Sequence, residues 1–205
     1  MLFITGTDTG VGKTFFASSL VRALRSLGIE AAGFKPVETG CTPECSDARL
    51  LGEASGVYLE PVYSFKTPVA PSVASELEGV KVEPERIKER IRELSARHPF
   101  LVVEGAGGIM VPITWSYTYL ELASELSLPT VVVALNKLGV INHTLLTVEV
   151  LRSRGVEVKA VVLNSFKKED ESFDTNYQSL KRLLDLPLFQ FSRPEDALPV
   201  ALSLL

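Results

Sequence analysis

The sequence is poor in histidine and cysteine, has no basic excess and contains no long apolar run. Its 205 residues include two His, two Cys, 21 Lys and Arg, and 25 Asp and Glu, so the net charge is −4. Nucleic-acid-binding domains usually carry a basic excess, and this balance argues against that class. A helix that crosses a bilayer needs about 20 consecutive apolar residues, which excludes a membrane protein of that kind. Because Asp8 interrupts the N-terminal apolar stretch, no signal peptide is expected, and we predict a cytoplasmic protein.

The two cysteines, Cys41 and Cys45, lie close together, whereas His98 and His143 are distant from them in sequence. A metal site would need further ligands nearby, so the pattern does not favour one. A disulfide stays open as an alternative, but disulfides are rare in cytosolic proteins. The prediction is therefore two free thiols in a loop.

One glycine-rich stretch carries the strongest functional signal. Residues 6–14 read Gly-Thr-Asp-Thr-Gly-Val-Gly-Lys-Thr, after a short apolar strand and before a predicted helix. This context is typical of a P-loop, whose backbone N–H groups surround phosphate oxygens. Lys13 is predicted to reach the outer phosphates, and the Thr14 hydroxyl to ligate Mg²⁺. The first glycine is at Gly6 rather than position 7, so the loop is a longer variant; a turn that binds nothing is the alternative.

Predicted strands and helices alternate along the chain. The best strands are apolar throughout, which indicates a parallel sheet covered on both faces. We therefore predict one α/β domain over residues 1–205, a three-layer sandwich of the P-loop NTPase type with a mainly parallel sheet. The predicted strands are 2–4, 31–34, 100–103, 129–135, 158–163 and 188–191, and the predicted helices are 14–24, 46–54, 72–78, 84–96, 119–126, 142–154 and 172–184. Residues 37–45 and 61–71 are expected to be irregular.

Four predicted strands end in residues that suit ligand binding, which are Gly6, Lys35, Glu104 and Asn164. Ligands of parallel sheets bind beyond the carboxyl ends of the strands, so we expect these residues to share one rim. An acidic residue at a strand end, such as Glu104, would hold Mg²⁺ together with Thr14.

Simpler alternatives exist for Lys35 and Asn164 at the rim, and for Asp47 at a predicted helix start. Lys35 could neutralise a transferring phosphoryl group or an anionic substrate, or it could be an ordinary exposed lysine. Asp47 could complete the magnesium shell, or it could only stabilise the start of its helix. Asn164 could bind a base edge or serve as a turn residue.

Five motifs then occur in order along the chain. They are GTDTGVGKT at 6–14, FKPVETG at 34–40, SDA at 46–48, VVEGAGG at 102–108 and NKLGVINHT at 136–144. Together they resemble the dethiobiotin synthetase family of biotin synthesis. The resemblance implies ATP- and Mg²⁺-dependent ring closure of 7,8-diaminononanoate with CO₂ or bicarbonate, releasing ADP and phosphate. It also implies that an N7-carbamate attacks the γ-phosphate and that the N8 amine closes the resulting carbamic-phosphoric anhydride.

The resemblance also assigns roles to residues of this sequence. Thr14, Asp47 and Glu104 would hold magnesium. Nucleotide and phosphates would be bound by Gly10, Val11, Gly12, Lys13, Thr14, Phe15, Asp47, Glu104, Gly105, Ala106, Gly107, Asn164 and Ser165. The catalytic residues would be Lys13, Lys35 and Thr9.

Substrate binding is implied at two places. Thr9, Lys35 and Thr39 would contact the diamine and its carbamate. The family is a homodimer in which the partner's helix start holds the substrate carboxylate, here Gly139, Val140 and Asn142. The C-terminal stretch 192–195 matches the family loosely.

Other P-loop classes fit the sequence less well. A MinD/ParA-like ATPase switch would carry a lysine near Asp8, which this chain lacks. Cobyrinate diamide synthases have an added glutaminase domain, for which 205 residues leave no room. A non-catalytic nucleotide-binding module would have little use for Lys35 and Asp47.

Overall fold

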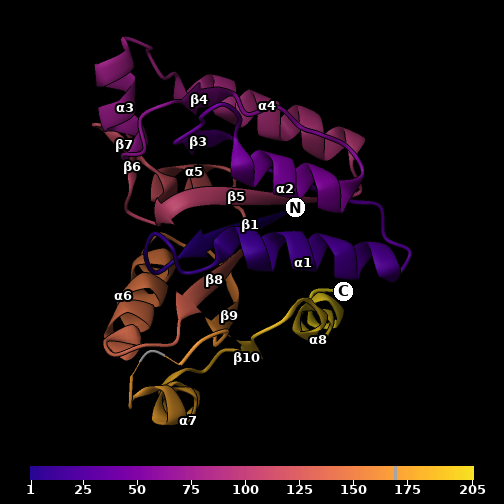
Figure 1. Ribbon diagram of the computed structural model, residues 1–205, viewed down its shortest axis with the longest axis vertical. Coiled ribbons are helices and arrows are strands. Elements are labelled where there is room, and N and C mark those ends of the chain that lie inside the picture. Colours follow the sequence, from indigo (N-terminus) through magenta and orange to yellow (C-terminus); the bar gives the residue numbers. More distant parts are fainter. Residues whose placement is uncertain (169) are drawn as a thin grey trace.

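The structure is a computed structural model, and it describes residues 1–168 and 170–205. A six-stranded sheet forms its middle layer, in the order β10-β9-β8-β1-β5-β2, and every neighbouring pair runs parallel (Figure 1). The strands are β1 (Leu2–Gly6), β2 (Ala31–Phe34), β5 (Phe100–Gly108), β8 (Thr130–Leu135), β9 (Val158–Asn164) and β10 (Leu188–Phe191). The predicted parallel sheet is confirmed.

The strands are apolar throughout because each of their faces is covered by helices. In β1, Phe3 packs into one apolar cluster, whereas Leu2 and Ile4 pack into another on the opposite face. Successive side chains of a strand point to opposite faces, so a strand buried on both sides needs an unbroken apolar run. β1 lies between β5 and β8, which places the loop that follows it at the middle of the carboxyl edge.

Helices α1 (Lys13–Ser26), α2 (Ser46–Ser55) and α8 (Ala197–Ser203) cover one face of the sheet. Along α1, Phe16, Leu20 and Leu24 recur at helical spacing and are fully buried. Gly28 then takes a φ of 81°, a left-handed conformation that commonly ends a helix.

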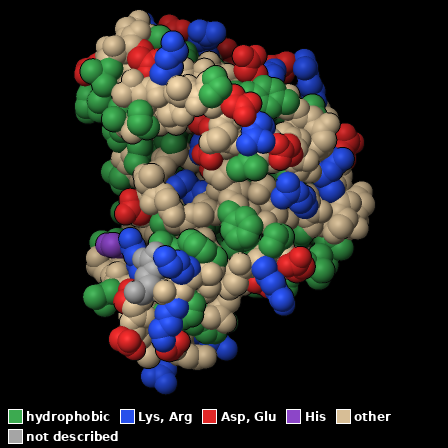
Figure 2. All heavy atoms as spheres, in the orientation of Figure 1, with side chains coloured by type: hydrophobic (Ala, Val, Ile, Leu, Met, Phe, Trp, Pro, Cys, Tyr) green, Lys and Arg blue, Asp and Glu red, His purple; other side chains and the backbone are tan. Residues whose placement is uncertain are grey.

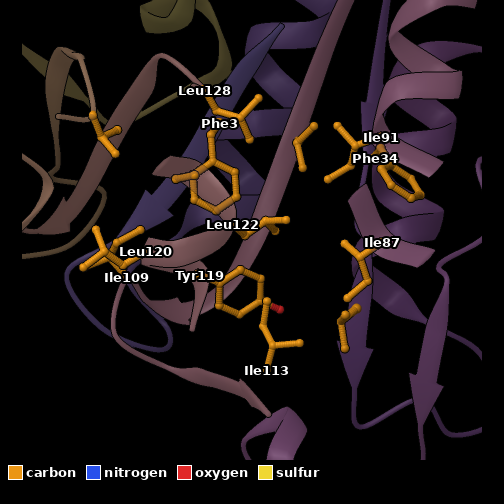
Figure 3. Close-up of a cluster of buried hydrophobic side chains, with 14 of the residues drawn as sticks. Phe3, Phe34, Ile87, Ile91, Ile109, Ile113, Tyr119, Leu120, Leu122 and Leu128 are labelled. Atoms are coloured by element: carbon orange, nitrogen blue, oxygen red, sulfur yellow. The ribbon is translucent and has the colours of Figure 1, made fainter. Parts of the chain in front are cut away.

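Helices α4 (Pro84–Arg97), α5 (Tyr119–Glu125) and α6 (Val140–Ser153) cover the other face, and α7 (Phe173–Leu183) packs beside α6. Figure 3 shows Phe3 and Tyr119 close together within this second cluster, with Ile87 and Ile91 nearby. The two aromatic rings stack with their centroids 6.2 Å apart.

Two small sheets and a short helix lie beside the carboxyl edge. β3 (Val37–Thr39) pairs in parallel with β4 (Tyr63–Phe65), and β6 (Pro112–Thr114) pairs antiparallel with β7 (Tyr117–Thr118). α3 spans Pro71–Glu78, next to β6. The prediction that 37–45 and 61–71 are irregular is wrong at β3 and β4, because these three-residue strands form through a partner distant in sequence.

The surface mixes charges of both signs. Figure 2 shows acidic and basic side chains interspersed over the visible face, with hydrophobic side chains gathered along its left edge near α3. Of the helices in the described ranges, none combines the length and apolarity that crossing a bilayer requires.

Candidate active site

The glycine-rich loop joins β1 to α1, and a side chain at the end of β9 holds it in place. Gly10 and Gly12 have φ values of 74° and 90°, in the left-handed region that favours glycine. Asn164, at the end of β9, donates from Nδ2 to the Val11 carbonyl oxygen at 2.9 Å. A Cβ atom on Gly12 would lie 2.1 Å from that amide nitrogen, so the contact itself requires glycine.

Lys35 lies just beyond the end of β2 and connects two carboxylates. Its Nζ donates to Glu104 Oε1 at 2.6 Å and to the Gly105 carbonyl oxygen at 3.0 Å, and it lies 2.9 Å from Asp47 Oδ2. The side chains of Lys35 and Glu104 are 3% and 0% exposed, whereas Asp47 is 33% exposed. Lys35 is therefore buried among its partners, which contradicts its reading as an ordinary exposed lysine.

Burial and charge act against each other in this cluster. Burial and then the Lys35 ammonium lower the pKa of Lys13 to about 8. Burial also disfavours the charge on Lys35, but Glu104 and Asp47 outweigh it and raise the pKa of Lys35. For Asp47, burial acts to raise the pKa, but Lys35, Thr14 and Lys13 together outweigh burial, and the pKa lies below its ordinary value. Lys35 and Asp47 are therefore an ion pair at neutral pH.

Three side chains supply oxygen atoms of the kind that Mg²⁺ prefers. Thr14 Oγ1 donates to Glu104 Oε1 at 2.8 Å, and Asp47 shares Lys35 with the same carboxylate. Glu104 Oε2 is buried and has no hydrogen-bond partner among the residues that the structure describes. A buried carboxylate oxygen without a partner is costly, so this donor set fits a magnesium ion.

These residues line one cavity of about 410 Å³ at the carboxyl edge of the sheet. Its walls come from the glycine-rich loop, from the Lys35–Thr39 segment, from the start of α3 and from the end of β5. The predicted site residues that line it are Thr9, Gly10, Gly12, Lys13, Thr14, Phe15, Lys35, Thr39, Asp47, Glu104, Ala106 and Gly107.

Two predicted residues beside the cavity pack into the core instead of lining it. Val11 is 2% exposed and belongs to the apolar cluster beneath α1. A Cβ atom on Gly105 would lie 2.9 Å from the Phe3 ring and 3.4 Å from the Tyr119 ring. The small size of Gly105 is therefore explained by packing against these two rings.

Five further predicted residues also lie outside the cavity lining. Asn164 is fully buried beneath the glycine-rich loop, and Ser165 Oγ accepts a hydrogen bond from Asn136 at 3.1 Å. Gly139 precedes α6 with a φ of 90°, Val140 is the first residue of that helix, and Asn142 is exposed. Adenine contacts by Asn164 and Ser165, and binding of a carboxylate by the α6 start, stay predictions.

Sequence reasoning missed Glu38 and the segment Pro68–Pro71, all of which line the cavity. Glu38 lies on β3, and its carboxylate accepts hydrogen bonds from the backbone at the start of α2. Burial raises its pKa, against the effect of these two N–H groups. The sequence signal that could have indicated Glu38 is its position between Lys35 and Thr39 in the same motif. Pro68–Pro71 carried none, because its approach depends on the path of β4 and α3.

The prediction of free thiols is wrong, because Cys41 and Cys45 form a disulfide. The loop between β3 and α2 turns back on itself, which brings the two Cα atoms to 4.3 Å. This path is set by the pairing of β3 with β4 and by the position of α2, neither of which the cysteine spacing reveals.

In this chain, a glycine-rich loop of the phosphate-binding type follows β1, an inner strand of a parallel sheet. These features define the class of P-loop α/β proteins. A family model described as an AAA domain matches residues 1–190. ATP-dependent dethiobiotin synthetase BioD of Anaeromyxobacter dehalogenans strain 2CP-1 is 49% identical over 189 residues, covering 89% of this chain and 84% of that protein. The protein of the same name from Aquifex aeolicus strain VF5 is 40% identical over 197 residues, covering 95% and 90%. The chain belongs to the ATP-dependent dethiobiotin synthetase family, a family of ligase-type enzymes.

Solved structures of other P-loop proteins share the fold. The septum site-determining protein MinD of Pyrococcus horikoshii OT3, complexed with Mg-ADP, matches with a TM-score of 0.59 over 97% of this chain and 85% of that chain, at 14% identity. The signal recognition particle receptor FtsY of Elizabethkingia anophelis matches with a TM-score of 0.52 over 98% and 64%, also at 14% identity. At such identities the likeness concerns the fold alone, and the family membership above does not favour the MinD/ParA-like alternative.

Proposed function

We propose that this chain closes 7,8-diaminononanoate and CO₂ into the cyclic urea of dethiobiotin, using ATP. The observation that carries the proposal is the meeting of Lys13, Lys35, Thr14, Asp47 and Glu104 in one cavity beside the glycine-rich loop. Phosphoryl transfer depends on positioning and on neutralising charge more than on a strong base. This cavity holds ammonium, hydroxyl and carboxylate groups of that kind.

The reaction would begin with the N7 amine, which adds to CO₂ and loses a proton to give a carbamate. A carbamate oxygen then attacks the γ-phosphorus, the bond to the ADP oxygen breaks, and a carbamic-phosphoric anhydride forms. Lys13 would bind the phosphoryl oxygens, while Lys35 would stabilise the carbamate and the phosphoryl group in transfer. The N8 amine finally attacks the carbonyl carbon and loses a proton, the bond from that carbon to the phosphate oxygen breaks, and the ring closes as phosphate leaves.

The remaining residues would orient the reactants. Gly10 and Gly12 let the loop backbone direct its N–H groups at the phosphates. Thr9 and Thr39 would hydrogen-bond the diamine and its carbamate. Thr14, Asp47 and Glu104 would hold Mg²⁺, which supplies charge neutralisation for the phosphates when it is bound.

We also propose that the enzyme works as a homodimer. Two large apolar side chains are strongly exposed on neighbouring elements, namely Leu77 on α3 at 66% and Trp115 in the turn between β6 and β7 at 65%. Figure 1 places α3, β6 and β7 at the end of the molecule to which the strands point. Figure 2 shows hydrophobic side chains gathered along this edge near α3, and an exposed apolar patch can mark an interface between proteins. A partner seated there would bring the start of its α6 toward the cavity, where it could bind the substrate carboxylate.

The decisive experiment supplies the purified protein with ATP, Mg²⁺, the diamine and ¹³C-bicarbonate. We expect one labelled carbon in dethiobiotin by mass spectrometry, and ADP release only when diamine and bicarbonate are both present. Lys13→Ala should abolish both products, because the lost charge acts mainly in the transition state. Rapid ATP hydrolysis without diamine or bicarbonate, and no labelled product, would favour the ATPase-switch alternative instead.

A further inference from the structure

Glu38 joins two walls of the cavity. It lies on β3 and is 4% exposed, between Lys35 and Thr39 in sequence. One carboxylate oxygen accepts a hydrogen bond from the Asp47 N–H and the other from the Ala48 N–H, each at 2.8 Å. A single side chain of the strand therefore binds two of the N–H groups in the first turn of α2.

The start of α2 depends on this contact. The first N–H groups of a helix have no partner within the helix, and a side chain just before the helix usually accepts from them. Within the described residues, the Cys45 side chain at this position makes no capping hydrogen bond. Glu38 takes over that role from another element, so the start of α2 is tied to β3 as well as to its own preceding loop.

A structural role alone would not require a carboxylate inside a cavity suited to phosphates. A negative charge there repels a polyanion, and a local serine or aspartate could cap α2 without that disadvantage. The Glu38 carboxylate instead holds the backbone of Asp47, whose own side chain lies 2.9 Å from Lys35. Its two N–H partners and the positive end of the helix dipole offset its charge.

We propose that Glu38 is a positioning residue that holds the Asp47 carboxylate where it can bind a divalent cation in the cavity. This proposal rests on the function proposed above, in which Asp47 helps to hold the divalent cation. Both carboxylate oxygens of Glu38 accept from the backbone of α2. Glu38 acts through the start of α2, in the way that outer hydrogen-bond partners of metal ligands orient those ligands.

The test measures binding of Mn²⁺ in the presence of ADP, by electron paramagnetic resonance of the free ion. Loss of an outer partner of a metal ligand typically weakens metal binding about 10–100-fold. Glu38→Ala is expected to weaken Mn²⁺ binding at least about tenfold. Glu38→Gln keeps one acceptor oxygen and should lie between Glu38→Ala and the parent. In turnover, Glu38→Ala should lower kcat more than it raises KM for the diamine.

Glu121→Ala provides the matched control. Glu121 completes a capping box with Thr118 at the start of α5, outside the cavity lining. Its loss should lower Tm as Glu38→Ala does, while Mn²⁺ binding stays at the parent value. Should Glu38→Ala fail to fold, Glu38→Gln is measured in its place.

Unchanged Mn²⁺ affinity in a folded Glu38 variant, or an equal loss in Glu121→Ala, would overturn the proposal. Failure of the proposed reaction can also be distinguished from failure of the proposed role of Glu38. A parent protein that makes no dethiobiotin, but in which Glu38→Ala still weakens Mn²⁺ binding, would refute the proposed reaction and support the role of Glu38.

Discussion

Among single residues, Lys35 connects the charged groups of the cavity. Its ammonium binds Glu104, Asp47 and the Gly105 carbonyl, and its side chain is 3% exposed. Breaking a buried ion pair by removing one partner costs about 3–5 kcal/mol, because the other charge is left without compensation. Lys35 therefore contributes both to folding and to the charge that the cavity offers to an anion.

Lys35→Ala should lower kcat at least about 100-fold, the usual loss when one stabilising group of a transition state is removed. ATP should still bind, because the glycine-rich loop and Lys13 are intact. Steady-state kinetics and calorimetric nucleotide binding separate the two effects. Lys88→Ala is the matched control, since it also breaks a lysine–glutamate pair, with Glu125, but outside the cavity lining. Parental kcat in folded Lys35→Ala would remove Lys35 from the catalytic residues.

Because of Lys13, ATP binding should be coupled to the uptake of a proton at alkaline pH. Burial and Lys35 lower its pKa to about 8, so the free protein loses this charge as pH rises through that value. Unfolding would restore the ordinary pKa of 10.5, so between the two values the unfolded chain binds more protons and this contribution to stability rises with pH. Phosphates favour the charged form, and ATP binding at about pH 8.5 should therefore take up a proton.

Calorimetry of ATP binding in buffers of different ionisation enthalpy measures that proton uptake. Lys13→Arg is the control, because a guanidinium remains charged throughout this pH range. The uptake should be present in the parent and absent from Lys13→Arg. Equal uptake in both proteins would assign the proton to another group.

At the scale of elements, the loop between β3 and α2 sets the geometry of one cavity wall. Thr39 ends β3 just before this loop, Asp47 lies in the first turn of α2 just after it, and the Cys41–Cys45 disulfide closes it. The Cys41 N–H also donates to the Phe65 carbonyl oxygen at 2.9 Å, which ties the loop to β4. Several contacts outside the glycine-rich loop thus fix where Asp47 lies.

Opening the disulfide should lower stability modestly. A cross-link over so short a loop restricts the unfolded chain by about 2 kcal/mol in the chain-entropy model. We expect a lower Tm for the Cys41→Ser, Cys45→Ser double variant, and a similar fall for the parent with a reductant. The double variant with reductant is the control and should not change further. The expectation would be contradicted if thiol titration shows that the reductant has opened the disulfide of the parent, but its Tm equals that of the untreated parent.

For the whole molecule, the exposed apolar side chains on α3 and in the turn between β6 and β7 mark where we expect a partner to pack. Trp115, the one tryptophan of the sequence, is 65% exposed there and donates from Nε1 to Glu76 on α3 at 2.5 Å. This contact ties the turn between β6 and β7 to α3, whose start lines the cavity. Assembly at this end would therefore affect the site directly.

Leu77→Glu should weaken the proposed homodimer, because it places a charge in an apolar interface. Mass by light scattering across a dilution series measures this, and Trp115 emission should shift to longer wavelength as dimers separate. Leu205→Glu is the matched control, since Leu205 is 67% exposed against 66% for Leu77 but lies at the C-terminus, away from α3 (Figure 1). A parent that is monomeric at every concentration would refute the homodimer.

The sequence predicted those features that depend on residues close together in the chain. The strand, the glycine-rich loop and the start of α1 are contiguous, and Gly10 and Gly12 adopt the positive φ that such a loop needs. The apolar runs of β5, β8 and β9 indicate burial on both faces, which implies a parallel sheet. Because parallel strands share one carboxyl edge, the meeting of Lys35, Glu104 and the loop followed without coordinates.

Only the tertiary structure decided the contacts between segments that the chain order keeps apart. β3 exists because β4 pairs with it, the cysteines meet because their loop turns back, and Glu38 caps a helix to which it does not belong. Local spacing encodes a turn or a helix face, but the approach of two separate segments depends on how all the layers pack. For that reason, Lys13, Lys35, Asp47 and Glu104 could be proposed from the sequence, whereas Glu38 and the contacts that hold Asp47 beside Lys35 required the fold.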